Sequence, residues 1–140
     1  MLSKEFSDEE IINYIVTFYH DFAGGYLDSD LDREDGARKF VDNGYAEMDD
    51  EHPDFYRLSK KGEGLLHECI AKITKDFTKF VDGRKVSIDE ASQWFTQQYQ
   101  LSDAETSNEI RDYIVSNSHN YSKTLRKGHS SRFGDYIEII

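Results

Sequence analysis

The residue types that can do covalent chemistry come together in one run of the sequence, His67-Glu68-Cys69. Consecutive residues of a helix point in different directions, so these three side chains do not converge on one reacting atom. Cys69 falls among apolar residues, where a thiol acts as a small buried hydrophobe rather than as a nucleophile. The chain also contains no GxGxxG, P-loop, GxSxG or HExxH motif. We therefore predict that the protein is not an enzyme and holds no cofactor.

Histidine and aspartate occur together in two further places where a divalent cation could bind. His20 is followed by Asp21, and three aspartates between residues 49 and 54 surround His52. Neither group has the ligand spacing that marks a zinc or calcium site. We predict adventitious binding at most, and no resident metal.

The binding of anions is the chemistry that the C-terminal residues favour. Residues 119–132 contain no acidic side chain. The cationic and titratable side chains of this stretch are His119, Lys123, Arg126, Lys127, His129 and Arg132. Lysine and arginine bind phosphate groups, and protonation of the histidines at acid pH would strengthen that binding. The stretch is either such a binding site or a basic loop in solvent.

The protein as a whole is acidic, but its acidic residues are concentrated in the first part of the chain. The 140 residues contain 17 lysines and arginines and 28 aspartates and glutamates, a formal net charge of −11. Residues 1–58 contain 5 basic and 16 acidic side chains, residues 59–118 contain 8 and 10, and residues 119–140 contain 4 and 2. The total argues against a protein that coats nucleic acid with its whole surface. The asymmetry assigns any contact with nucleic acid to the C-terminal part.

Capping boxes and apolar periodicity predict the helices that position these residues. The boxes begin at Ser7, Ser87 and Ser102, each with a glutamate three residues later. With the caps at Asp32 and Ser59, they predict helices over 8–23, 33–43, 60–81, 88–98 and 103–117. Two hairpins are predicted, with arms at 45–48 and 55–58 and at 121–126 and 135–140. Residues 26–31 are either a short extended piece or a turn of helix. The fold class is mainly α with small β-hairpins, an α+β protein with one unit over 1–82 and a second over 83–140.

The long helix predicted over 60–81 carries an apolar seam. Its residues step by four and three positions and are Leu66, Ile70, Ile73, Phe77 and Phe80. The spacing is typical of a helix that packs against another helix. The seam is either the core of this chain or the contact of a homodimer.

Two segments of the first half resemble the winged helix-turn-helix proteins, and most closely the MarR- and PadR-type regulators. The resemblance covers residues 39–66, from Lys39 to Glu47 and from Phe55 to Leu66. In those families a helix ends at a Gly-Tyr pair, as at Gly44-Tyr45, and a two-stranded wing follows. A Tyr-x-Leu-Thr-x-x-Gly segment then opens the next helix, and Tyr56-Arg57-Leu58-Ser59-Lys60-Lys61-Gly62 fits it with serine for threonine. The resemblance implies a winged helix and a role in transcription regulation.

The N-terminal winged helix is poorly suited to contact DNA itself. Its presumed recognition helix begins Asp32-Arg33-Glu34-Asp35, and its wing tip reads Asp49-Asp50-Glu51. Both would meet the phosphates of the duplex and be repelled by them.

The second half has the order helix, helix, helix, wing, which predicts a second winged helix that shares the long central helix. Its last helix presents polar residues that suit base edges, and its wing is basic. We therefore predict a DNA-binding transcriptional regulator that contacts double-stranded DNA through its C-terminal half. The predicted contacts are Ser107, Asn108, Arg111, Lys123, Arg126, Lys127, His129 and Arg132.

The alternative is a winged-helix adaptor or inhibitor that binds a basic protein, or imitates nucleic acid, through an acidic face. That face consists of Asp28, Asp30, Asp32, Glu34, Asp35, Asp49, Asp50 and Glu51. Electrostatic complementarity would speed the association and select the partner. For either function we expect no membrane segment, because no apolar run is long enough to span a bilayer. We also expect a cytoplasmic protein, because the single cysteine excludes an internal disulfide.

Overall fold

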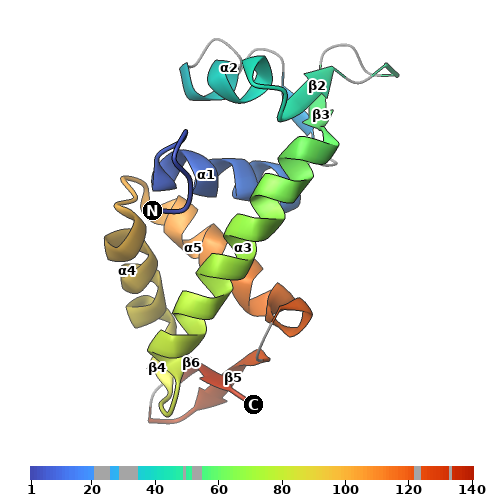
Figure 1. The fold of residues 1–140 in the computed structure, drawn as a ribbon. Helices are drawn as coiled ribbons and strands as arrows, with labels where there is room; N and C mark the ends of the chain where they lie inside the picture. The colour runs from blue at the N-terminus through green and yellow to red at the C-terminus, as the bar shows by residue number, and fades with distance from the viewer. Residues whose placement is uncertain (21–25, 29–34, 49, 52–54, 122–123, 133) are drawn as a thin grey trace. The chain divides into compact units, whose positions relative to one another are not determined.

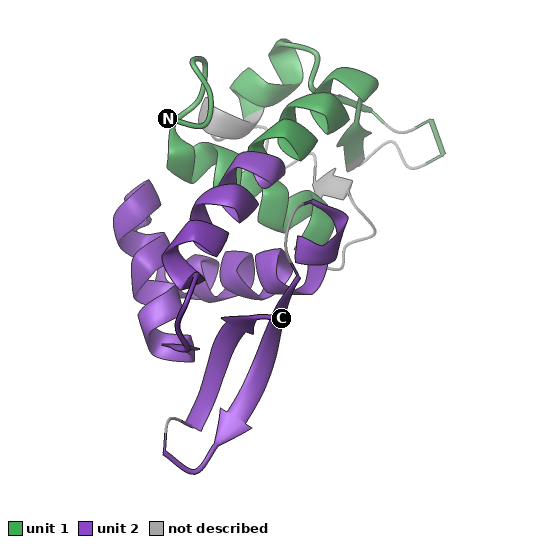
Figure 2. Ribbon diagram, turned by 60° about the horizontal axis from the view of Figure 1, so that its bottom comes forward, with its two compact units in different colours: residues 1–69 green, residues 70–140 purple. Residues whose placement is uncertain are grey.

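The computed structural model describes the chain except for residues 21–25, 29–34, 49, 52–54, 122–123 and 133. The described residues form helices and short antiparallel strands (Figure 1), so the predicted α+β class is confirmed. The chain divides into two compact units, residues 1–69 (unit 1) and 70–140 (unit 2), coloured separately in Figure 2. The units meet within the long helix α3, Lys60–Val81, rather than after it as the sequence had indicated.

Unit 1 begins with a helix whose predicted cap is confirmed. Its elements are α1 (Asp8–Ile15), the π-helical turn η1 (Val16–His20), β1 (Tyr26–Asp28), α2 (Asp35–Asp42), β2 (Ala46–Met48), β3 (Phe55–Leu58) and the first part of α3. The Glu10 amide donates to Ser7 Oγ at 3.1 Å, and the Ser7 amide donates to Glu10 Oε1 at 2.9 Å. This reciprocal pair satisfies two amides that have no partner within the helix.

The three strands of unit 1 form one antiparallel sheet in the order β1-β3-β2. The predicted hairpin is confirmed, since Glu47 lies opposite Arg57 and Met48 opposite Tyr56. The segment whose conformation the sequence left open is extended over Tyr26–Asp28 and pairs with the other side of β3. The predicted cap of α2 at Asp32 lies outside the described residues.

The residues of the Gly-Tyr and Tyr-x-Leu-Ser-x-x-Gly motifs form one junction between α2, β2 and α3. Gly44 ends α2 with a φ of +81°, a conformation that glycine adopts without strain. Ser59 Oγ donates to the Gly44 carbonyl at 2.5 Å and accepts from the Gly62 amide at 3.1 Å. A Cβ atom on Gly62 would lie 1.9 Å from the Tyr45 carbonyl oxygen, so α3 can start at this point only with glycine at position 62.

Aromatic side chains form much of the core of unit 1. Phe40 is fully buried, and its ring centroid lies 4.1 Å from that of Tyr14 and 5.2 Å from that of Tyr45. Phe6 adds an edge contact to both tyrosines. Burial, with a smaller contribution from the Glu10 charge, raises the pKa of Tyr14 well above its ordinary value.

Unit 2 contains two helices between its first strand and its hairpin. Its elements are residues 70–81 of α3, β4 (Val86–Ser87), α4 (Ile88–Tyr99), α5 (Ala104–Asn117), the 3₁₀ turn η3 (Ser118–Asn120), β5 (Leu125–Ser130) and β6 (Gly134–Ile139). Ser87 caps α4 as predicted, accepting from the Glu90 amide at 3.1 Å. The predicted cap of α5 at Ser102 is wrong by one residue, because Asp103 accepts from the Glu105 amide at 3.0 Å. Serine and aspartate both suit an N-cap, and the backbone places the first helical turn directly after Asp103.

The sheet of unit 2 has the order β4-β6-β5, again antiparallel. The predicted hairpin exists, but its arms are displaced, so that residues 127–130 lie in a strand and not in the loop. Gly128 lies opposite Tyr136, and a Cβ atom on Gly128 would lie 2.4 Å from the Tyr136 ring. Tyr136 therefore packs directly over the glycine, which fixes the register of the two strands.

Buried apolar side chains from every helix of unit 2 form its core. Phe77, Phe95, Ile110, Ile114 and Ile137 are all fully buried. Ser118 is buried with them, donating to the Val115 carbonyl at 3.1 Å and accepting from the Leu125 amide at 2.8 Å, and so joins α5 to β5.

The apolar seam of α3 lies in the interior of the chain. Leu66, Ile70, Ile73 and Phe77 have no exposed surface, and only Phe80 of the five seam residues is partly exposed. The seam therefore serves as core, one of the two roles that the sequence left open.

Candidate functional site

Polar side chains form a layer between α4 and α5, of which α5 was predicted to contact DNA. Thr96 Oγ1 and Ser107 Oγ lie 2.6 Å apart, and Ser92 Oγ donates to Asn108 Oδ1 at 2.7 Å. Ser92 and Thr96 are four residues apart, so both face the neighbouring helix. Sequence reasoning missed these two residues, although a pair of hydroxyls at that spacing was a usable signal.

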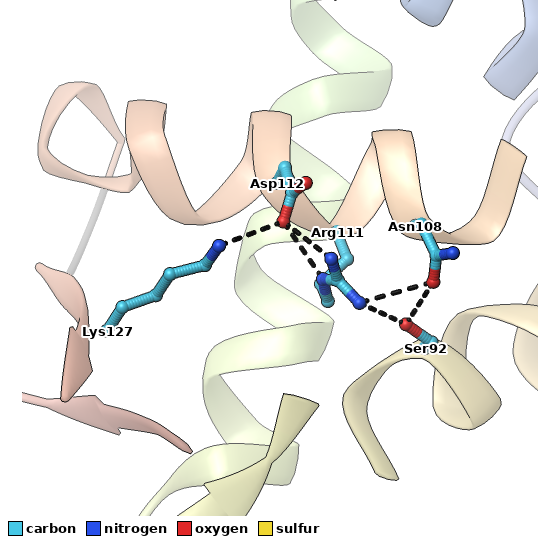
Figure 3. Close-up of polar contacts among 5 residues, drawn as sticks. All are labelled: Ser92, Asn108, Arg111, Asp112 and Lys127. Atoms are coloured by element: carbon cyan, nitrogen blue, oxygen red, sulfur yellow. Dashed lines mark hydrogen bonds and ion pairs between the residues drawn. The ribbon is translucent and has the colours of Figure 1, made fainter. Parts of the chain in front are cut away.

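Arg111 extends this layer towards the hairpin. Its Nη1 donates to Ser92 Oγ at 2.6 Å and to Asn108 Oδ1 at 3.2 Å (Figure 3). Its Nε donates to Asp112 Oδ1 at 3.0 Å, and its Nη2 lies 2.9 Å from the same oxygen. The side chain of Arg111 is only 10% exposed, so these bonds compensate a charge that is largely removed from water.

Asp112 connects α5 to the hairpin through a second ion pair. The same oxygen that receives Arg111 lies 3.4 Å from Lys127 Nζ on β5 (Figure 3). Asp112 and Lys127 have side-chain exposures of 37% and 52%, so the pair is open to solvent. We name Arg111, Asp112 and Lys127 the Asp112 node. The contact of Asp112 with Lys127 could not be predicted, because nothing local in the sequence indicates that this side chain reaches a strand fifteen residues away.

Two other basic side chains of the hairpin, Arg126 and His129, also lie beside carboxylates. Arg126 forms a hydrogen-bonded ion pair with Glu138, its neighbour across the strands. The hydrogen bond and the charge of Glu138 raise the pKa of Arg126 above its ordinary value. His129 Nδ1 lies 3.0 Å from Asp135 Oδ1, again across the strands. Two basic side chains of the β5–β6 hairpin are therefore offset by carboxylates on the opposite strand.

The structure brings some of the predicted DNA-contacting residues together and separates others. Asn108, Arg111 and Lys127 join one network, whereas Ser107 is 1% exposed and faces α4. The prediction that Ser107 reads base edges does not fit that burial, because Ile110 and Ile114 place this side of α5 in the core. Arg126, Lys127, His129 and Arg132 are exposed on the hairpin. Lys123 lies outside the described residues.

Half of the acidic face predicted for unit 1 falls on residues that the structure does not describe. Asp30, Asp32, Glu34 and Asp49 lie outside the described residues. Asp28 ends β1 and Asp35 begins α2, while Asp50 and Glu51 are exposed after β2. The difference in net charge between the units follows from their composition alone. Residues 1–69 contain 18 acidic and 7 basic side chains, and residues 70–140 contain ten of each.

A hollow of about 500 Å³ is lined by Asp82, Gly83, Arg84, Lys85, Glu138 and Ile139 of unit 2. Its cations have partners within the unit. Arg84 lies 3.4 Å from Glu90 and its guanidinium is 4.2 Å from the Phe80 ring centroid. The Lys85 ammonium lies 4.7 Å from the centroid of Tyr136.

Cys69 is buried, and its thiol donates to the Leu2 carbonyl at 3.6 Å. Among the residues that the structure describes, no three histidine, cysteine, aspartate or glutamate side chains form a group that could hold a metal ion. Within the same residues no helix is both long and apolar enough to cross a membrane.

No family model, no curated protein and no solved structure matches this chain. We therefore infer the function from the order of the strands and the distribution of charge.

Proposed function

We propose that both units are winged helices and that the protein is an adaptor or inhibitor, which binds a basic protein through unit 1. The strand orders β1-β3-β2 and β4-β6-β5 support the first part. In each unit a helix leads into the first strand, helical structure follows, and a hairpin adds the third strand between the other two. The junction of Gly44, Ser59 and Gly62 supports it further, because it gives a structural role to the residues that resemble the winged-helix regulators.

The observation that carries the adaptor function is the difference in charge compensation between the units. Unit 1 contains eleven more acidic than basic side chains, so no set of internal ion pairs can neutralise it. In unit 2, by contrast, Arg111, Arg126 and Lys127 each have a carboxylate partner. The uncompensated field of the protein is therefore negative and centred on unit 1, which attracts a cationic partner and repels a polyanion.

The experiment is a fluorescence anisotropy titration with a labelled peptide of ten lysines and arginines. The test variant is Asp50→Asn/Glu51→Gln in unit 1, and the control variant is Glu105→Gln/Asp135→Asn, which makes the same charge change in unit 2. We expect the test variant to lose about fivefold in affinity, because two exposed charges contribute about 0.5 kcal/mol each. Equal losses in the two variants would show that only total charge matters and would overturn the assignment to unit 1.

A second candidate function is DNA binding by unit 2, as a transcriptional regulator. The order of its elements favours it, because α4 and α5 precede a hairpin as a helix-turn-helix precedes a wing. On this candidate Lys127→Glu weakens binding to a duplex and flattens its salt dependence. Unchanged affinity of that variant across a salt titration would reject the candidate.

The proposal places the adaptor in a reducing compartment such as the cytoplasm, because one buried cysteine allows no internal disulfide. A homodimer through the α3 seam is not part of it, because four of the five seam residues are enclosed in the chain.

A further inference from the structure

The Asp112 node contains an exposed cation of unit 2, Lys127, that an approaching nucleic acid could meet. Lys127 lies on the β5 edge strand, and its side chain is 52% exposed. Arg111, the other cation of the node, is 10% exposed and bonded to Ser92 and Asn108, so it is not available to an incoming phosphate. An anion that approaches the node therefore meets Lys127 and Asp112 side by side.

We infer that Asp112 is a specificity-determining residue of unit 2, which prevents Lys127 from binding phosphodiesters. This inference goes beyond the proposed function, which concerns unit 1 and a basic protein. Its basis is the position of one carboxylate oxygen, which contacts Arg111 at 2.9 and 3.0 Å and Lys127 at 3.4 Å (Figure 3). A phosphate must displace this oxygen from Lys127 or bind beside its negative charge, and both cost free energy.

The charges around the node act in the same direction. Glu105 is exposed on the first turn of α5, and Asp112 itself is 37% exposed on the third. Arg126, which directly precedes Lys127 in β5, is already paired with Glu138. Lys127 is a cation of this surface whose recorded carboxylate partner a single substitution removes.

The substitution that tests the inference is Asp112→Asn. The asparagine keeps the shape of the side chain and an oxygen that accepts from Arg111, but it removes the charge that holds Lys127. The binding of a labelled 20-base-pair duplex is measured by anisotropy between 20 and 200 mM salt. We expect about a threefold to tenfold gain in affinity at low salt, and a salt slope steeper by about 0.9, the value for one additional phosphate contact.

Two further variants separate the release of Lys127 from a general gain in positive charge. Asp135→Asn makes the same charge change in the same unit, but its partner is His129. We expect it to leave the salt slope unchanged. Lys127→Gln added to Asp112→Asn should abolish the gain. Equal gains from Asp112→Asn and Asp135→Asn would overturn the inference, and so would a gain that survives the loss of Lys127.

Lys127→Gln in the otherwise unchanged protein keeps the test decisive even if Asp112→Asn does not fold. If Asp112 holds Lys127 away from phosphate, this variant binds the duplex as the wild type does. A clear loss of duplex affinity would overturn the inference and support the DNA-binding candidate. The peptide titration of unit 1 is independent of these variants, so failure of the inference and failure of the proposed function are distinguishable.

Discussion

Units 1 and 2 share a strand order but join their helices to their strands in different ways. In unit 1 the junction depends on two glycines, Gly44 in the left-handed region and Gly62 against the Tyr45 carbonyl, which the half-buried hydroxyl of Ser59 bridges. In unit 2 the corresponding junction between α5 and β5 is made by a buried side chain, Ser118. The units also differ in charge, since unit 1 has a large surplus of carboxylates and unit 2 pairs several of its cations internally. One arrangement of strands thus supports both a strongly acidic surface and a nearly neutral one, so the arrangement alone does not determine the partner.

The largest effect is expected at Gly62, in the junction of unit 1. Gly62→Ala places a Cβ atom 1.9 Å from a carbonyl oxygen of the main chain, so the start of α3 must shift. We expect a loss of about 3 kcal/mol in the free energy of unfolding, measured by urea denaturation. Gly64→Ala is the matched control, because nothing lies within 4 Å of its added Cβ. It should stabilise α3 by about 0.5–1 kcal/mol, and a loss as large as that of Gly62→Ala would contradict the account.

A smaller effect is expected in the hairpin of unit 2. Gly128→Ala brings a Cβ atom within 2.4–2.7 Å of the Tyr136 ring, and a side chain can move further than a carbonyl in the main chain. We expect a loss of about 2 kcal/mol in the free energy of unfolding. The double variant Gly128→Ala/Tyr136→Val should lose less than the sum of the two single changes, because removing the ring removes the clash. Strict additivity would show that the glycine and the ring are not coupled.

The junction between α5 and β5 in unit 2 should depend on the hydroxyl of Ser118. Ser118→Ala leaves the Leu125 amide without the acceptor that it has in the core, which costs about 1–2 kcal/mol of the free energy of unfolding. Ser116→Ala, an exposed position on α5, is the control and should be neutral or slightly stabilising. Similar results for the two serines would remove the distinction between the junctions.

The smallest effect concerns alkaline pH. Burial, with a smaller contribution from Tyr121, raises the pKa of Tyr113 on α5 to about 12, against 10.0 for an ordinary tyrosine. Between these values the folded state keeps a proton that the unfolded state releases, so stability is full below pH 10 and falls as the pH rises towards 12. Urea denaturation at pH 9 and pH 11 measures this fall, which Tyr113→Phe should reduce. If the variant loses as much stability between pH 9 and pH 11 as the wild type, groups other than Tyr113 cause the loss.

Features fixed by neighbouring residues could be predicted from the sequence. The capping serines Ser7 and Ser87, the Gly44 turn and the β2–β3 hairpin follow from residues at most about a dozen positions apart. The cap of α5 was misplaced by one residue because Ser102 and Asp103 both suit the position, and only the observed backbone separates them.

Features that depend on side-chain contacts between different elements could not be predicted. The register of the β5–β6 hairpin depends on the contact between Gly128 and Tyr136, so the strand arms were displaced. Ser107 was assigned to the surface because the composition of α5 does not say which side faces α4. The Asp112 node joins α5 to β5, and no local pattern indicates such a contact.

The central claim, that the protein uses an uncompensated negative charge on unit 1 to bind a cationic partner, is tested most directly by a titration with two probes. The wild-type protein is titrated against the ten-residue cationic peptide and against a duplex of 20 base pairs, under the same conditions and at several salt concentrations. The account predicts binding to the peptide that weakens with salt, and little binding to the duplex throughout. Tight, salt-dependent binding to the duplex without binding to the peptide would contradict it.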